Sequence, residues 1–179
     1  IASRPDGAVW VASRGGSVRL VSPEGRSTRE IEAPAPLMSA AIGPDGKCYI
    51  CNNGGFIWHR ERDGYIRPAG RARDYKGGRI ERVDLATGKV ETLYTECEGV
   101  PLKGPNDIVF DDRGGFWFTD LGKIYDRLMD RGAVYYARAD GSSIREAVFP
   151  FLTPSGIGLS PGGETRYVAE IETSRLWCF

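Results

Sequence analysis

Apolar and polar residues alternate with a period of two along much of the chain, and short turns interrupt the alternation. The clearest stretches, SVRLVSPEG, GRIERVDLATG and GAVYYARADG, each end in a turn containing Gly, and another alternating stretch follows each of them. This alternation places successive side chains on opposite faces of a strand. Because no convincing stretch shows the period of a helix, we expect an all-β protein built from antiparallel strands.

A repeat organises the expected strands. Four segments share a glycine turn, an apolar run with an aromatic residue and a polar loop, and they span 5–16, 43–55, 111–122 and 160–172. Their turn glycines are Gly7, Gly46, Gly114 and Gly163, and the aromatic residues expected to pack inside the blades are Trp10, Tyr49, Trp117 and Tyr167. A four-stranded unit recurring about every 40 residues is typical of a β-propeller blade.

The repeat predicts a single partial β-propeller domain over residues 1–179, with about three and a half blades of four antiparallel strands. The expected limits are about 1–35 for blade one, about 36–100 for blade two, about 101–151 for blade three and about 152–179 for part of blade four. The largest insertion, residues 56–76, falls in blade two. Closed propellers have roughly four to eight blades. We therefore expect either further sequence of the same protein or another chain to complete the ring.

The repeat also aligns the residues that begin the innermost strand of each blade. Eight residues before the turn glycine stand Met38, Asn106 and Ser155, and the corresponding position for Gly7 falls before Ile1. Innermost strands converge on the propeller axis, so we expect these side chains to surround one point. The loops 51–56, 119–130 and 170–174 should lie at the same end, where Asn52, Asn53 and Asp120 are candidates to line a substrate pocket.

Composition narrows the choice of partner and compartment. Lys plus Arg and Asp plus Glu number 24 each, without a basic stripe, which argues against nucleic acid or a membrane surface as the main partner. Cys48 and Cys51 stand three apart in a strand-like stretch and should point to opposite faces, so we expect free thiols and a cytoplasmic setting. The single histidine, His59, leaves little material for Ser-His-Asp chemistry.

The stretches GPNDIVFDDRGGFWFTD, CNNGGF, GGRIERVDLATGKVETLY and TPSGIGLSPGGETRYVAE make the chain resemble the SMP-30/gluconolactonase/LRE-like family of six-bladed propellers. The resemblance implies a lactone hydrolase that acts on a small lactone or a sugar-derived substrate. It also implies one divalent cation in the central channel, Ca²⁺ before Zn²⁺ or Mg²⁺, which would polarise the lactone carbonyl.

The resemblance assigns the cation ligands residue by residue. Asn106 matches the family's third-blade Asn, and Ser155 stands where the fourth-blade Asn is usual. The first-blade Glu would lie just before Ile1, and the catalytic Asp of the fifth blade would lie beyond Phe179. The catalytic residue is therefore unknown in this chain, and Asp107 and Asp120 are its nearest, weak substitutes.

Other interpretations stay open. A non-catalytic propeller that binds a small molecule or serves as a scaffold fits the replacement of Asn by Met38 and Ser155. A relative of strictosidine synthase would share the propeller with different central residues. Residue by residue, Asn106 could satisfy backbone groups at a strand start, Asn52 and Asn53 could form a turn, and Asp120 could hydrogen-bond a loop.

Overall fold

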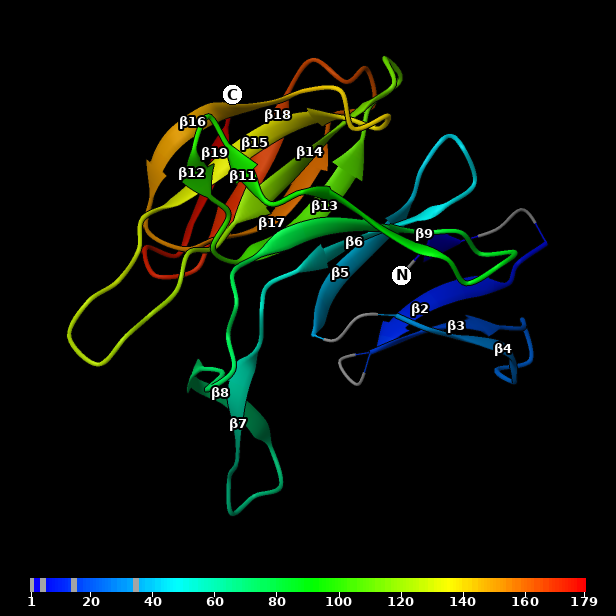
Figure 1. The fold of residues 1–179 in the computed structure, drawn as a ribbon, viewed down its shortest axis with the longest axis horizontal. Coiled ribbons are helices and arrows are strands. Elements are labelled where there is room, and N and C mark those ends of the chain that lie inside the picture. Colours follow the sequence, from blue (N-terminus) through cyan, green and yellow to red (C-terminus); the bar gives the residue numbers. More distant parts are fainter. Residues whose placement is uncertain (1, 4–5, 14–15, 34–35) are drawn as a thin grey trace.

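The computed structural model describes residues 2–3, 6–13, 16–33 and 36–179, and these ranges contain strands and turns but no helix (Figure 1). Accordingly, no helix within them is long and apolar enough to cross a membrane. The strands form four successive antiparallel sheets, which confirms the predicted all-β class. Three of these sheets have four strands and the last has three.

Each sheet is built from strands close in sequence. The first contains β1 (Ala2–Ser3), β2 (Val9–Ser13), β3 (Ser17–Val21) and β4 (Ser27–Glu32). The second contains β5 (Leu37–Ile42), β6 (Cys48–Asn52), β9 (Arg79–Val83) and β10 (Val90–Tyr94). The third contains β13 (Pro105–Phe110), β14 (Gly115–Asp120), β15 (Gly132–Arg138) and β16 (Ile144–Phe151). The fourth contains β17 (Pro154–Leu159), β18 (Arg166–Glu170) and β19 (Arg175–Cys178).

Two short pairs lie outside these sheets. β11 (Glu96–Cys97) pairs with β12 (Val100–Pro101), and β7 (Phe56–Arg60) pairs with β8 (Ile66–Arg71). The second pair, which we call the insert hairpin, is formed by the large insertion of the second repeat and projects away from the sheets in Figure 1.

The first strands of neighbouring sheets contact one another. β13 contacts both β5 and β17, and β5 also contacts β1 and β2. We call β5, β13 and β17 the inner strands. Their convergence is the arrangement that the glycine-phased repeat predicts.

The repeated glycines shape the turns that leave the inner strands. Gly46 follows β5 and has a φ of 74°, and Gly114 follows β13 and has a φ of 78°. An added Cβ at Gly46 would meet no atom within 4 Å, so the requirement there is for the left-handed backbone and not for space. The carboxylate of Asp45 completes this turn by accepting a hydrogen bond from the Lys47 N–H at 3.1 Å.

Aromatic side chains fill the space between the second and third sheets. The Tyr49 ring lies 4.8 Å from Phe110 and 5.6 Å from Phe116 between centroids, and the Tyr49 hydroxyl donates to the Ala139 carbonyl at 2.9 Å. Trp10 is also buried. Tyr167 departs from the predicted core packing, because its side chain remains 41% exposed on the last of the four sheets.

The cysteines of the second sheet occupy separate cores, as their spacing predicts. Cys48 packs in a cluster with Trp10 and Val18, whereas Cys51 packs with Tyr49 and Phe118. Both are free thiols, and burial raises the pKa of Cys48 to about 12 and that of Cys51 well above its usual value. These thiols are therefore unreactive packing groups.

Phe116→Ala should test how strongly the sheets depend on their shared core. The Phe116 side chain is fully buried, so truncation should lower the free energy of unfolding by about 3–5 kcal/mol. Val100→Ala, at a side chain 56% exposed, should change it by less than about 0.5 kcal/mol. Urea denaturation measures both, and equal losses in the two variants would contradict the assignment of this core.

Candidate functional site

The structure brings Asn106 and Ser155 together. Each follows a proline at the start of an inner strand, and each is partly buried. The Nδ2 group of Asn106 donates a hydrogen bond to Ser155 Oγ at 3.3 Å. Two side chains 49 residues apart in sequence thus meet across β13 and β17, and we call them the Asn106–Ser155 pair.

A strand irregularity occurs at the same place in all three inner strands. The pairing register shifts between Leu37 and Ser39 in β5, between Pro105 and Ile108 in β13, and between Pro154 and Ile157 in β17. Met38, Asn106 and Ser155 lie within these irregular segments. Because a bulge interrupts the ladder and re-aims side chains, it allows these positions to leave the strict in-and-out alternation.

Asp107 connects the three inner strands. Its Oδ1 atom accepts a hydrogen bond from the Ser39 hydroxyl of β5 at 2.7 Å, and its Oδ2 atom accepts one from the Ile157 N–H of β17 at 3.0 Å. The Asp107 N–H donates to Thr119 Oγ1, whose hydroxyl donates to the Ser155 carbonyl. Asp107 therefore fixes the distance between the strands that present Asn106 and Ser155.

Asn52 and Asn53 are buried and bonded within their own loop. The Asn52 amide donates to Glu81 Oε2 at 2.9 Å, and Asn52 Oδ1 accepts from the Gly54 N–H at 3.0 Å. Asn53 Oδ1 accepts from the Gly55 N–H at 2.8 Å. These contacts support the turn interpretation, and a substrate contact by either residue stays a prediction.

Asp120 holds two loops through three backbone N–H groups. Its carboxylate accepts hydrogen bonds from the backbone of Lys103 at 2.7 Å, Gly104 at 2.7 Å and Gly122 at 2.8 Å. Burial raises the pKa of this carboxyl, and the three N–H groups oppose that shift. These hydrogen bonds support the loop interpretation of Asp120, and a substrate role for it stays a prediction.

Lys123 is a buried cation that the sequence pattern does not reveal. Its side chain is 1% exposed, and Nζ donates to the Gly55 carbonyl at 3.1 Å. Nζ also lies 4.1 Å from the ring centroid of Phe56 and 5.2 Å from that of Tyr75. Burial, assisted by the charge of Arg71, lowers the pKa of Lys123 to about 8, although Asp120 and Asp130 act in the opposite direction. Lys123 thus ties the loop after β14 to the base of the insert hairpin.

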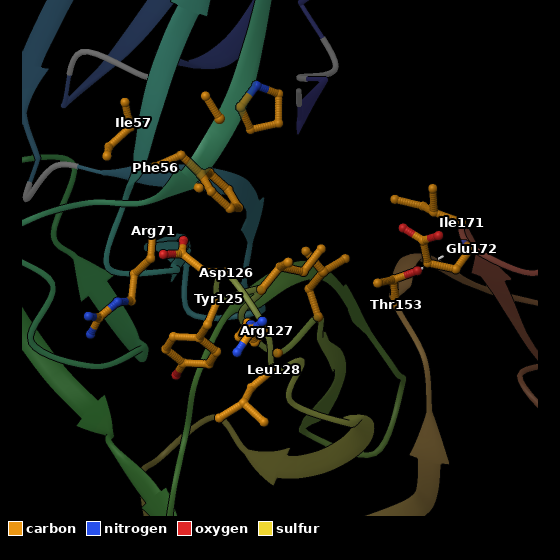
Figure 2. Close-up of a pocket in the computed structure, with 16 residues that line it drawn as sticks. Phe56, Ile57, Arg71, Tyr125, Asp126, Arg127, Leu128, Thr153, Ile171 and Glu172 are labelled. Carbon is orange, nitrogen blue, oxygen red and sulfur yellow. Dashed lines mark hydrogen bonds between the residues drawn. The ribbon is translucent and has the colours of Figure 1, made fainter.

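A cavity of about 930 Å³ lies between three loops. Figure 2 shows Phe56, Ile57 and Arg71 of the insert hairpin on one side and Thr153, Ile171 and Glu172 on the other, with the segment from Tyr125 to Leu128 between them. These are the loops expected at the end of the sheets where the inner strands begin. The described lining residues include Leu121 and Gly122, the neighbours of Asp120, but not Asp120, Asn52 or Asn53.

The cavity wall includes residues close in sequence to the Asn106–Ser155 pair, although neither Asn106 nor Ser155 is among the described residues that line it. Thr153 lines the cavity, and Ser155 follows two residues later, so the Cα atoms of the two residues are at most about 7 Å apart. Pro105, beside Asn106, pairs with Asp120, and the chain then enters the cavity wall at Leu121. The chain segments that carry the pair therefore lead into the cavity wall.

The pair supplies two neutral oxygen donors, one amide carbonyl and one hydroxyl. A hard cation such as Ca²⁺ prefers six to eight oxygen ligands that include carboxylates. In the described ranges no three His, Cys, Asp or Glu side chains form a group that could hold a metal ion. The pair therefore fits part of a cation site and requires carboxylates from elsewhere.

Lys123 predicts a specific dependence of stability on pH. Between about pH 8 and the ordinary lysine pKa near 10.4, the unfolded chain binds more protons at this residue than the folded chain does. The contribution of Lys123 to the free energy of unfolding should therefore rise with pH across this window. The Lys123→Met variant has no titratable group at this position. Urea denaturation from pH 7 to 10 should show the wild type gaining free energy of unfolding relative to Lys123→Met. Lys76→Met, at an exposed lysine, is the matched control, and a constant difference between the wild type and Lys123→Met would contradict the lowered pKa.

Comparison with known proteins places the chain in a family. A family model described as the SMP-30/Gluconolactonase/LRE-like region matches residues 6–179. Lactonase drp35 of Staphylococcus aureus (strain MRSA252) is 29% identical over 167 residues, which cover 90% of this chain and 44% of that protein. Lactonase drp35 of Staphylococcus saprophyticus is 37% identical over 71 residues, 40% of this chain and 21% of that protein. The chain thus spans less than half the length of these relatives.

Solved structures agree on the fold. A gluconolactonase from Xanthomonas campestris superposes with a TM-score of 0.71 at 22% identity, over 97% of this chain and 54% of that one. The β-propeller domain of Cps50 from Myceliophteria thermophila gives a TM-score of 0.60 at 12% identity, over 94% of this chain and 47% of that one. The four sheets are therefore propeller blades, and the chain belongs to the SMP-30/gluconolactonase/LRE-like family.

Proposed function

We propose that this chain forms part of a lactone hydrolase whose activity depends on a divalent cation bound at the Asn106–Ser155 pair. The convergence of these two side chains, on strands that lead into the wall of a cavity of about 930 Å³, is the observation that supports the proposal most directly. Membership of a family with gluconolactonases, and the names of the lactonase relatives, favour a lactone as the substrate.

The two side chains of the pair are suited to bind one cation together. The serine hydroxyl both donates and accepts hydrogen bonds, so it can turn its proton towards Asn106 Oδ1 after rotation of the amide. At least one lone pair of each oxygen then remains for a cation. Ca²⁺ is the first expectation, because both donors are oxygens, and Zn²⁺ or Mg²⁺ are alternatives.

Each part of the site has a separate task in this proposal. The bound cation would polarise the lactone carbonyl and stabilise the oxyanion. The cavity walls bind the lactone and limit the access of water, and Asp107 keeps the inner strands at a fixed separation. The group that activates water is not assigned to any residue of this chain.

A second candidate function is that of a non-catalytic propeller that binds a small molecule, and a different observation supports it. Ser155 offers a shorter donor than an asparagine would, and the carboxylates of Asp107 and Asp120 are engaged in hydrogen bonds with the protein itself. A site for which the described residues supply no group of acidic metal ligands suits binding better than catalysis.

Restoring the asparagine distinguishes the two functions. Under the lactonase proposal, Ser155→Asn should raise the affinity for Ca²⁺, and Asn106→Ala should lower it about 10- to 100-fold together with lactone hydrolysis. Calorimetric titration of the intact protein with Ca²⁺, Zn²⁺ and Mg²⁺ measures the affinity, and pH-stat titration measures hydrolysis.

The matched control is Ser143→Asn, at an exposed serine before β16, and it should leave both properties unchanged. Hydrolysis that persists in excess chelator would contradict the metal dependence. A Ser155→Asn variant that gains no metal affinity, in a protein that opens no lactone, would favour the non-catalytic propeller.

A further inference from the structure

The cavity walls are formed mainly by hydrocarbon groups. The insert hairpin contributes Phe56, Ile57 and Pro68, and the loop after β14 contributes Leu121, Ile124 and Leu128. Ile171 closes the side formed by the loop between β18 and β19. Three segments separated in sequence thus line one cavity with apolar side chains.

Several of these apolar side chains remain in contact with water. Ile57 is 42% exposed, Ile124 50%, Leu128 74% and Ile171 57%. Single exposed hydrophobic residues are ordinary, but their concentration around one cavity is unfavourable unless a ligand or another part of the protein covers them. The volume of about 930 Å³ lies within the range of small-molecule sites, about 300–1,000 Å³, which favours a small ligand as the occupant.

Two of the polar groups in the walls are engaged in hydrogen bonds within the protein. The Tyr125 hydroxyl donates to Asp130 at 3.1 Å, and Thr153 Oγ1 accepts from the Glu172 N–H at 2.9 Å. The Arg71 guanidinium lies 5.2 Å from the Tyr75 ring centroid and 5.3 Å from that of Tyr125. Asp126, Arg127 and Glu172 are exposed, so water competes with any ligand for their charged groups. Hydroxyl groups of a ligand that lie against the apolar walls would lose hydration without gaining a hydrogen bond, which is costly.

We propose that the preferred substrate is a lactone bearing an apolar substituent, such as an alkyl chain or an aromatic ring, and that the insert hairpin and the loops after β14 and β18 select it over polyhydroxylated sugar lactones. This inference rests on the proposed lactonase function for the reaction. The binding preference itself depends only on the cavity.

Non-hydrolysable lactams test the preference apart from catalysis. Calorimetry of the intact protein should show a γ-lactam with a hexyl chain binding at least about tenfold more tightly than gluconolactam, because burying two methylene groups already accounts for about that factor. Equal binding, or tighter binding of gluconolactam, would overturn the inference.

Two exposed positions test the assigned walls with little risk to folding. Leu128→Ser and Ile171→Ser should each weaken binding of the hexyl lactam about three- to tenfold and leave gluconolactam unaffected. Leu176→Ser is the matched control, because Leu176 is 70% exposed and does not line the cavity, and it should leave both affinities unchanged. Equal effects of Leu128→Ser and Leu176→Ser would also overturn the inference.

Hydrolysis separates this inference from the proposed function. Values of kcat/KM are compared for the γ-lactone with a hexyl chain and for gluconolactone. Hydrolysis of neither compound, with the lactam preference intact, would refute the lactonase proposal and support the apolar cavity. Hydrolysis that favours gluconolactone, with no lactam preference, would support a lactonase and refute the apolar selection.

Discussion

The contact between the first strands of successive sheets determines the rest of this structure. One carboxylate, that of Asp107, accepts hydrogen bonds from β5 and β17 while its own strand lies in contact with both. A partly buried carboxylate needs such partners, because an unpaired charge away from water is costly. The same bonds that satisfy Asp107 set the spacing of the inner strands, and this spacing allows Asn106 and Ser155 to meet.

The fold was accessible from the sequence because its signals are local. Turn glycines with positive φ and strands of period two recur in register, so the blades and their inner strands follow from short segments. The meeting of Asn106 and Ser155 followed from the same register. Tyr167 was the exception: it is 41% exposed, whereas its repeat equivalent Tyr49 is buried by side chains of the neighbouring sheet.

The remainder of the site depends on contacts between distant residues. Lys123 is buried because Gly55 and Phe56, about seventy positions earlier in the chain, come to meet it, and lysine on its own is usually exposed. The role of Asp107 depends on Ser39 and Ile157, which belong to other sheets. The sequence alone also left two interpretations for Asn52, Asn53 and Asp120, and their observed hydrogen bonds agree with the structural one.

The location of the candidate donors and of the apolar walls on different parts of the chain has an evolutionary consequence. Asn106 and Ser155 lie on inner strands held by the sheets, whereas the insert hairpin belongs to none of the four blade sheets and is joined to its neighbours through Lys123 and its aromatic contacts. Loops tolerate insertion and replacement far better than packed strands do. Lineages could therefore exchange or lengthen this hairpin and acquire new ligand preferences without disturbing the framework, and a library randomised in the hairpin alone would explore the same variation in the laboratory.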